Sequence, residues 1–295
     1  MTKKGTVKKR GSSGRSSAKR RPSSSKRGKS RKAAGGETPI WLHWVATCAF
    51  ACAVAIGFYL LFIRPFAYRW RPCNGSREYE VCLPDGFGVY GIDVSHHQGQ
   101  IDWRRVSMAV NKEFPLRFAF IKATEGGDFK DENYDGNIVS ARHAGLACGS
   151  YLFYNPATSP EVQADFFIRN VSLRKGDLPP VVDIEKYGDS HGRLQKELLE
   201  CLRILEEYYG VRPIIYTSYK FRKHYLNDSE FDSYQFWIAR YYAREPDSDM
   251  NWLMWQFSDR GRIDGIDGFT DMNVLNNGRK LQEIMAVRDV DARTD

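Results

Sequence analysis

The chain has 295 residues, of which 42% are hydrophobic and 14% aromatic; this suffices for one large domain and excludes disorder over most of the length. The net charge of +8 is local, because residues 1–39 hold fourteen Lys and Arg against Glu37 alone, which leaves −5 for the remainder. A basic folded domain that binds nucleic acid is therefore disfavoured, and we expect no nucleic-acid partner. The Ser/Gly/Lys/Arg-rich tail is itself typical of disorder.

Residues 40–63 contain no Asp, Glu, Lys or Arg and are long enough to cross a bilayer core of about 30 Å as one helix. A cleaved signal peptide is the alternative, but the apolar stretch is longer than is usual there and no small-x-small site precedes Arg64. The positive charge in front of the segment predicts a cytoplasmic N-terminus. We therefore expect a single-pass membrane protein whose folded domain lies outside the cytoplasm, in a periplasm or at the cell surface.

The expected organisation is a basic tail, a membrane anchor, a linker, one globular domain and a short C-terminal tail. Their boundaries are 1–39, 40–66, 67–86, 87–285 and 286–295. Of the six cysteines, Cys73 and Cys82 can form a disulfide if the linker faces an oxidising compartment, and a reduced pair is equally compatible with the sequence. Cys148 and Cys201 lie in apolar surroundings typical of buried thiols.

Eight short apolar runs recur along the globular part, each followed by polar residues. They are VYGIDVS, FAFIKAT, CGSYLFY, PPVVDIE, RPIIYTS, QFWIARY, LMWQFS and FTDMNVL. Amphipathic stretches separate several of them, at 133–144, 160–171 and 193–209. This alternation predicts an α/β fold with a parallel sheet, and eight strands without a phosphate-binding glycine motif favour a barrel like that of triosephosphate isomerase. The late strands follow one another closely, so some helices must be missing there.

Asp183 and Glu185 stand two residues apart at the end of the run PPVVDIE. Side chains at i and i+2 of a strand project to the same face, with Cα atoms about 6.6 Å apart, so both carboxyl groups should face one cavity. Mutual repulsion there raises one pKa and leaves a protonated acid beside an ionised carboxylate. Glycosidic cleavage requires this pairing. A helix cap or an ion pair with Lys186 is the simpler alternative.

The first run leads into GIDVSHHQGQIDW, which places Asp93 on the same side of the predicted barrel. Adjacent His96 and His97 point to different sides of the chain, so hydrogen bonding within a loop is favoured over a metal site. Asp102, next to Trp103, is expected to cap the helix that follows. No metal or cofactor is expected.

The last run, FTDMNVL, adds Asp271 and Asn273, again at i and i+2. Aromatic and amide side chains stand at or near the other strand ends, where rings can stack on sugars and amides can bind hydroxyl groups. They are Tyr151, Phe153, Tyr154, Tyr216, Trp237, Tyr241, Trp255 and Gln256. Each alone is more often a core residue, but together they suit a carbohydrate cleft.

In these motifs the chain from about 89 to 275 resembles the family 25 glycoside hydrolases, the Chalaropsis-type lysozymes. The matching segments are DVSHHQG with IDW, FIKATEG, GSYLFY, LPPVVDIE, IIYTS, WIARY, WQFS and TDMN. The resemblance implies an irregular barrel of about five β/α units and three further strands. It also implies an N-acetylmuramidase that hydrolyses the β-1,4 bond between N-acetylmuramic acid and N-acetylglucosamine in peptidoglycan.

Carried over by position, Glu185 is implied to be the general acid, with Asp183 and Asp93 as further catalytic carboxylates. Asp271 is implied to line the site, and the implied substrate contacts are Tyr151, Tyr154, Tyr216 and Gln256. The second half of the reaction stays open between inversion, a covalent intermediate and attack by the N-acetyl group of the substrate, and we rank the last route first.

Three other functions remain compatible with parts of the sequence. A cell-wall glycan-binding module would keep the cleft without turnover, and a hydrolase of another β-1,4 amino-sugar polymer, such as chitin, could use the same acids. A cytoplasmic nucleic-acid protein would depend on the basic tail alone. We expect a monomeric peptidoglycan hydrolase anchored to the membrane by one helix.

Overall fold

The computed structural model describes residues 39–64, 73, 76–111 and 113–294; for residues 110 and 111 only the backbone is described. The contacts divide the chain into two units, one ending at Phe58 and one beginning at Tyr59. The expected tail 1–39 lies almost entirely outside the described residues.

The first unit contains the apolar helix α1 (Ile40–Phe58), which continues into a π-helical turn (Tyr59–Ile63). Every described residue of α1 except Gly57 is exposed, and none is buried. Residues 40–63 form a single stretch that is long and apolar enough to cross a membrane. Exposed apolar side chains around the whole circumference are what a helix solvated by lipid requires.

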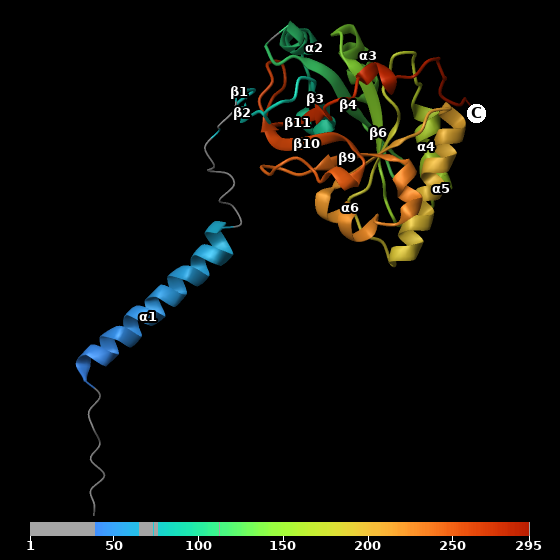
Figure 1. Cartoon of the computed structure of the whole chain (residues 1–295). Helices are drawn as coiled ribbons and strands as arrows, with labels where there is room; N and C mark the ends of the chain where they lie inside the picture. The colour runs from blue at the N-terminus through green and yellow to red at the C-terminus, as the bar shows by residue number, and fades with distance from the viewer. Residues whose placement is uncertain (1–38, 65–72, 74–75, 112, 295) are drawn as a thin grey trace, which may run out of the picture. The chain divides into compact units, whose positions relative to one another are not determined.

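The second unit is built on a sheet that closes on itself (Figure 1). Its strands are β3 (Tyr90–Val94), β4 (Leu116–Glu125), β6 (Ala147–Phe153), β7 (Val181–Asp183), β8 (Ile214–Ser218), β9 (Gln235–Ala239), β10 (Trp252–Gly261) and β11 (Thr270–Leu275). Neighbouring strands pair in the order β3-β11-β10-β9-β8-β7-β6-β4, and β3 pairs with β4 to close the barrel. Short β5 (Phe129–Lys130) adds to β4. All eight expected strands are present.

Helices follow the first five barrel strands. They are α2 (Trp103–Val106), α3 (Tyr134–His143), α4 (Pro160–Asn170), α5 (His191–Tyr209) and α6 (Tyr219–Tyr225). After β9 only 3₁₀ turns intervene among the described residues, and β11 runs antiparallel to both β10 and β3. The expected barrel of five β/α units plus three further strands is confirmed, and Figure 1 shows α4 and α5 side by side on its outer face.

The residues at the ends of the longer helices explain where these helices begin and end, and the spacing of their apolar residues explains which face is buried. Ser159 caps α4 by accepting a hydrogen bond from the N–H of Val162, with Pro160 at the first helical position. In α5, apolar side chains recur every three or four residues and are buried against the barrel, while Gly210 ends the helix in the left-handed conformation. Asp102 caps α2 as expected, accepting from the N–H groups of Arg104 and Arg105.

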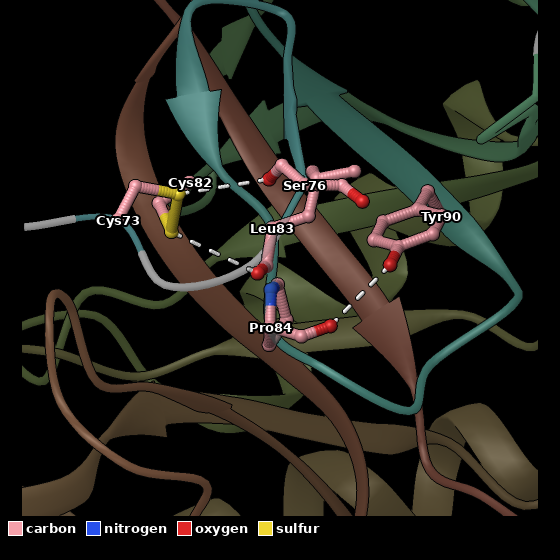
Figure 2. Close-up of a disulfide and its surroundings, with 6 residues drawn as sticks. All are labelled: Cys73, Ser76, Cys82, Leu83, Pro84 and Tyr90. Carbon is pink, nitrogen blue, oxygen red and sulfur yellow. Dashed lines mark hydrogen bonds between the residues drawn. A yellow bond between two sulfur atoms is a disulfide. The ribbon is translucent and has the colours of Figure 1, made fainter.

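A two-stranded hairpin, β1 (Arg77–Glu78) and β2 (Val81–Cys82), precedes the barrel. It is closed by a disulfide between Cys73 and Cys82, which lies next to Ser76 and Leu83 (Figure 2). Tyr79, Val81 and Leu83 are buried in the main core. The segment expected to be a linker, 67–86, thus contributes core side chains from its described part.

The C-terminal residues are also packed against the barrel unit. Leu173 and Val290 exchange two backbone hydrogen bonds of 2.8 Å, and Ala286 is buried. The described part of the expected tail 286–295 therefore packs against the end of α4 and the loop between α4 and β7.

Candidate active site

A cleft opens where the carboxyl ends of the parallel barrel strands meet, and it encloses about 260 Å³. This is the end at which barrels of this kind gather their chemistry. The cleft is lined by Asp93, Val94, Ser95, His97, Gln98, Lys122, Tyr151, Phe153, Asp183, Glu185, Tyr216, Trp237, Tyr241, Gln256 and Asp271.

The four acids singled out in the sequence all line this one cleft. Asp183 is the last residue of β7 and Glu185 follows two positions later, so the alternation of the strand carries both to the same side. Asp93 on β3 and Asp271 on β11 are direct partners in the antiparallel register. Residues far apart in the chain thus meet because β11, the last strand, pairs with β3, the first strand of the barrel.

Asp93 is held by a chain of buried amide groups. Gln256 Nε2 donates to both carboxylate oxygens of Asp93, at 2.9 and 3.1 Å, and Asn273 Nδ2 donates to Oδ1 at 2.7 Å. Gln256 Oε1 accepts from the hydroxyl groups of Tyr216 and Tyr241 at 2.8 and 2.7 Å. The amide groups are thereby oriented with their N–H donors toward Asp93, which fixes the position of that carboxylate.

Burial raises the pKa values of these acids, because charge is costly away from water. For Asp93 burial raises the pKa to about 6, against the opposing effect of its hydrogen bonds with Asn273 and Gln256. Burial, with the nearby charge of Asp93, raises the pKa of Asp271 to about 9. Desolvation also raises the pKa of Glu185, opposed by the Tyr216 hydroxyl and the Lys186 charge. Of these acids, Asp271 therefore retains its proton at neutral pH.

Asp183 combines burial with an unused acceptor. Its side chain is 7% exposed, and its Oδ1 atom is buried without a hydrogen-bond partner in the protein. Desolvation raises the pKa of Asp183 well above the ordinary value, with further contributions from Glu185 and Asp93, while Lys122 lowers it. A buried carboxyl oxygen without a partner is costly in the free protein, so it is suited to accept an N–H or O–H group of a ligand.

Aromatic rings form the walls of the cleft. Tyr151 and Phe153 stand at i and i+2 of β6, and both line the cleft. Trp237 stacks on Phe120 with ring centroids 4.7 Å apart and contacts Tyr216 edge-on at 4.6 Å. Its indole N–H donates to Asn273 Oδ1 at 2.8 Å, which extends the network under Asp93.

Tyr154 does not belong to this wall, contrary to the expected substrate contact. It follows Phe153 and so points to the opposite face of the sheet, where it is fully buried in the core. The charged groups that act on its hydroxyl, Glu161, Glu197 and Arg193, belong to α4 and α5. Trp255 points outward for the same reason, next to inward-pointing Gln256, and packs against Phe87.

His96 is engaged in the loop hydrogen bonds that its sequence predicts. Its Nδ1 atom and its backbone N–H contact Asp131 Oδ2 at 2.9 and 2.8 Å. Across the described part of the chain, no three His, Cys, Asp or Glu side chains are grouped so that they could hold a metal ion.

One member of the site, Lys122, was not singled out in the sequence, and Asn273, which was singled out beside Asp271, has a role that the sequence did not indicate. Lys122 is 5% exposed and lines the cleft, where its ammonium group pairs with Glu125 at 2.6 Å. Asn273 is fully buried and orients Asp93 rather than facing the cleft. The sequence contained a signal for the role of both residues. Each is a polar residue inside an otherwise apolar strand, and a polar side chain that is buried there needs a hydrogen-bond or ionic partner.

Comparisons with known proteins agree with this architecture. Residues 92–266 match the model of glycosyl hydrolases family 25. The chain is 38% identical over 242 residues to YegX of Escherichia coli (strain K12), which covers 81% of this chain and 85% of that protein. It is 32% identical over 218 residues to Lysozyme M1 of Streptomyces globisporus, with 68% and 72% covered.

A solved structure extends the comparison to the fold. The family 25 glycosyl hydrolase from Bacillus anthracis superimposes with a TM-score of 0.62 at 31% identity, covering 69% of this chain and 96% of that one. The family match spans more than half of the chain and includes three of the four cleft acids, Asp93, Asp183 and Glu185. The chain belongs to glycosyl hydrolase family 25 and is a glycoside hydrolase.

Proposed function

We propose that the chain is a peptidoglycan hydrolase, a lysozyme that cleaves the β-1,4 bond between N-acetylmuramic acid and N-acetylglucosamine. The single observation that carries this proposal is the placement of Asp183 and Glu185 side by side in a cleft lined with aromatic rings. The similarity to Lysozyme M1 supports the choice of substrate.

Glu185 is the proton donor in this proposal. It lies at the open side of the cleft, and desolvation raises its pKa, which favours the protonated form that a general acid needs. Protonation of the glycosidic oxygen lets the leaving sugar depart as positive charge develops at the neighbouring anomeric carbon.

Asp183 orients the substrate in the same step. Its unpartnered buried oxygen can accept the N–H of the 2-acetamido group, which directs the carbonyl oxygen of that group toward the anomeric carbon. The C–O bond to the leaving sugar breaks as the acetamido oxygen bonds to this carbon. Glu185, now ionised, then takes a proton from the water that opens the cyclic intermediate, giving net retention. Asp93 and Asp271 set the electrostatic field of the cleft, and Tyr151, Tyr216 and Gln256 complete its wall.

The location of the reaction is part of the proposal. We infer that residues 40–63 anchor the chain in a membrane as a single span, with the basic N-terminus in the cytoplasm and the barrel outside. The Cys73–Cys82 disulfide supports an oxidising compartment for the barrel. The barrel is proposed to act as a monomer.

The first test is digestion of purified peptidoglycan by the full-length chain in detergent, followed by borohydride reduction of the new sugar ends. Reduced N-acetylmuramic acid is the expected product, and reduced N-acetylglucosamine would contradict the assigned bond. Chitin is digested in parallel as the alternative substrate. If sugar ends were released faster from chitin than from peptidoglycan, the chain would be a hydrolase of another amino-sugar polymer. Proton NMR of early products should show retained anomeric configuration; inversion would eliminate the assisted route.

The second test removes the proton donor. Glu185→Gln should lower kcat by at least about 10³-fold without loss of binding to insoluble peptidoglycan, because the amide keeps the shape but cannot donate a proton. Glu230→Gln, an exposed change away from the cleft, is the matched control and should retain full activity. Full activity of Glu185→Gln would refute the role of Glu185 as proton donor. If the parent chain itself bound peptidoglycan without cleaving it, the chain would instead be a glycan-binding module.

A further inference from the structure

The hairpin between β10 and β11 carries two arginines packed on one aromatic ring. The guanidinium carbons of Arg260 and Arg262 each lie 4.3 Å from the ring centroid of Phe269. All three side chains are exposed. Contacts of this kind stabilise by about 0.5–1 kcal/mol at exposed sites, enough to orient the guanidinium groups without removing them from solvent.

This arginine pair borders the cleft. Phe269 comes directly before β11, whose second residue, Asp271, lines the cleft. Gln98, which also lines the cleft, donates from Nε2 to the carbonyl oxygen of Phe269 at 3.2 Å. The two guanidinium groups therefore flank the place where a glycan bound over Asp271 would leave the cleft.

Unlike the two lysines that lie over Phe153, the arginine pair has no carboxylate partner within the described part of the chain. Lys122 and Lys186 lie 4.9 and 4.8 Å from the ring of Phe153, but both contact Glu125, at 2.6 and 4.0 Å. Among the residues that the structure describes, neither Arg260 nor Arg262 forms a salt bridge. Their planar N–H donors remain available for an anion, and the guanidinium group matches a carboxylate in bidentate geometry.

The backbone that presents the arginines is held from two sides. The N–H of Arg262 donates to the carbonyl oxygen of Tyr79 in the disulfide-closed hairpin at 2.8 Å, and Arg105 Nε donates to Asp264 at 3.2 Å. Tyr79 is buried and donates its hydroxyl to Phe114 O at 2.6 Å. A binding group on a braced backbone loses less entropy when it takes up a ligand.

We propose that Arg260 and Arg262 form a subsite for the carboxylate groups of the peptides attached to the glycan. This inference rests on the proposed function, because it assigns the peptide-bearing part of the same substrate to a defined edge of the cleft. It predicts that the enzyme prefers glycan strands that still carry their peptides over strands from which the peptides have been removed.

The test compares intact peptidoglycan with the same glycan after amidase removal of its peptides, using the full-length chain in detergent. Arg260→Gln/Arg262→Gln should raise KM about 5–10-fold on the intact substrate, with kcat changed less than about twofold and no change on the stripped glycan. Arg193→Gln/Arg203→Gln on the outer face of α5 removes the same charge and should change neither. An equal rise of KM on both substrates, or no rise on either, would overturn the subsite.

A binding measurement tests the arginine subsite independently of the proposed hydrolase activity. In the Glu185→Gln background, calorimetry with soluble peptide-bearing and peptide-free glycan fragments should give a Kd ratio that the arginine substitutions abolish. A parent chain that hydrolyses neither substrate but keeps this ratio would refute the hydrolase and leave the subsite standing. A ratio that survives Arg260→Gln/Arg262→Gln would refute the subsite alone.

Discussion

Asp93 illustrates how a carboxylate is kept ionisable inside a barrel. Burial raises its pKa to about 6, and without the three donors from Gln256 and Asn273 the pKa would rise further. Gln256 lines the cleft, but its amide group is engaged with Asp93 and the two tyrosines, so it acts as a positioning residue. Its exposure of 1% and its four hydrogen bonds leave it no freedom to rotate.

Gln256→Ala should therefore lower kcat by about 10–10²-fold, because Asp93 loses two of its donors. The acidic limb of the pH–kcat profile that reports Asp93 should shift to higher pH, since those donors favour the ionised form. Gln282→Ala, an exposed position, is the control. A variant that loses thermal stability but keeps the parental pH profile would show that Gln256 has only a structural role.

Asp271 carries a stability cost that depends on pH. Burial, with the charge of Asp93, raises its pKa in the folded state to about 9, whereas an unfolded aspartate titrates near 4. Between these values the folded state binds more protons than the unfolded state, so the free energy of unfolding falls as pH rises.

Asp271→Asn removes this dependence. The variant should melt a few degrees above the parent at pH 8 and within about 1 °C of it at pH 4.5, where both forms are neutral in the folded state. Differential scanning calorimetry across this range measures the difference. Asp267→Asn, an exposed change in the same hairpin, serves as control. A constant difference at both pH values would contradict the linkage.

At the scale of elements, side chains alternate between the two faces of each strand, and this alternation decides which of them reach the cleft. Tyr151 and Phe153 of β6 point inward, and Tyr154, which follows β6, points outward. On β10, Gln256 points inward and Trp255 outward. A strand end therefore supplies the cleft with alternate residues only, and a cluster of aromatic residues there divides between the site and the core.

The hairpin of β1 and β2 is the element for which the sequence was least informative. Its strands are two residues each, too short for a periodic pattern, yet Tyr79, Val81 and Leu83 join the core. The Cys73–Cys82 disulfide closes this hairpin and therefore limits the conformational freedom of this segment in the unfolded chain. In the folded chain, the same hairpin holds the backbone N–H of Arg262.

Reduction of this disulfide should destabilise the barrel by about 2–3 kcal/mol, the chain-entropy value for a loop of about ten residues. Thermal melts of the full-length chain with and without dithiothreitol should differ by several degrees. Cys73→Ser/Cys82→Ser should melt like the reduced parent and no longer respond to dithiothreitol, whereas Cys48→Ser/Cys52→Ser should respond like the parent. Identical melts of the oxidised and reduced parent would contradict the stabilising role.

At the scale of the whole molecule, the two units have opposite surfaces. Helix α1 buries none of its side chains, whereas the barrel unit encloses its apolar residues and keeps its acids in one cleft. The proposed topology places these acids where wall glycan is found.

A reporter joined after Asp295 tests this topology. Alkaline phosphatase, which requires disulfides to become active, should be active there, and a reporter that needs the cytoplasm should be silent. Joining the same reporters after residue 39 should reverse the result. An active cytoplasmic reporter after Asp295 would refute the exported barrel and revive the nucleic-acid alternative.

The sequence by itself determined the long apolar helix, the eight strands, the longer helices of the barrel and the grouping of Asp183 with Glu185. These features depend on local information, namely an uninterrupted apolar run, a period of two or 3.6 residues, and a spacing of i and i+2. Each of these features can be recognised from residues that are close together in the sequence. The family motifs likewise follow the chain order.

Only the tertiary structure decided which distant residues meet. The register of β11 against β3 makes Asp271 the partner of Asp93, and the closure of the barrel brings Gln256 and Asn273 to that carboxylate. The outward position of Tyr154 depends on the pleat of β6, and a shift of one residue would reverse it. Strand register arises from contacts far apart in sequence, so no local pattern contains it.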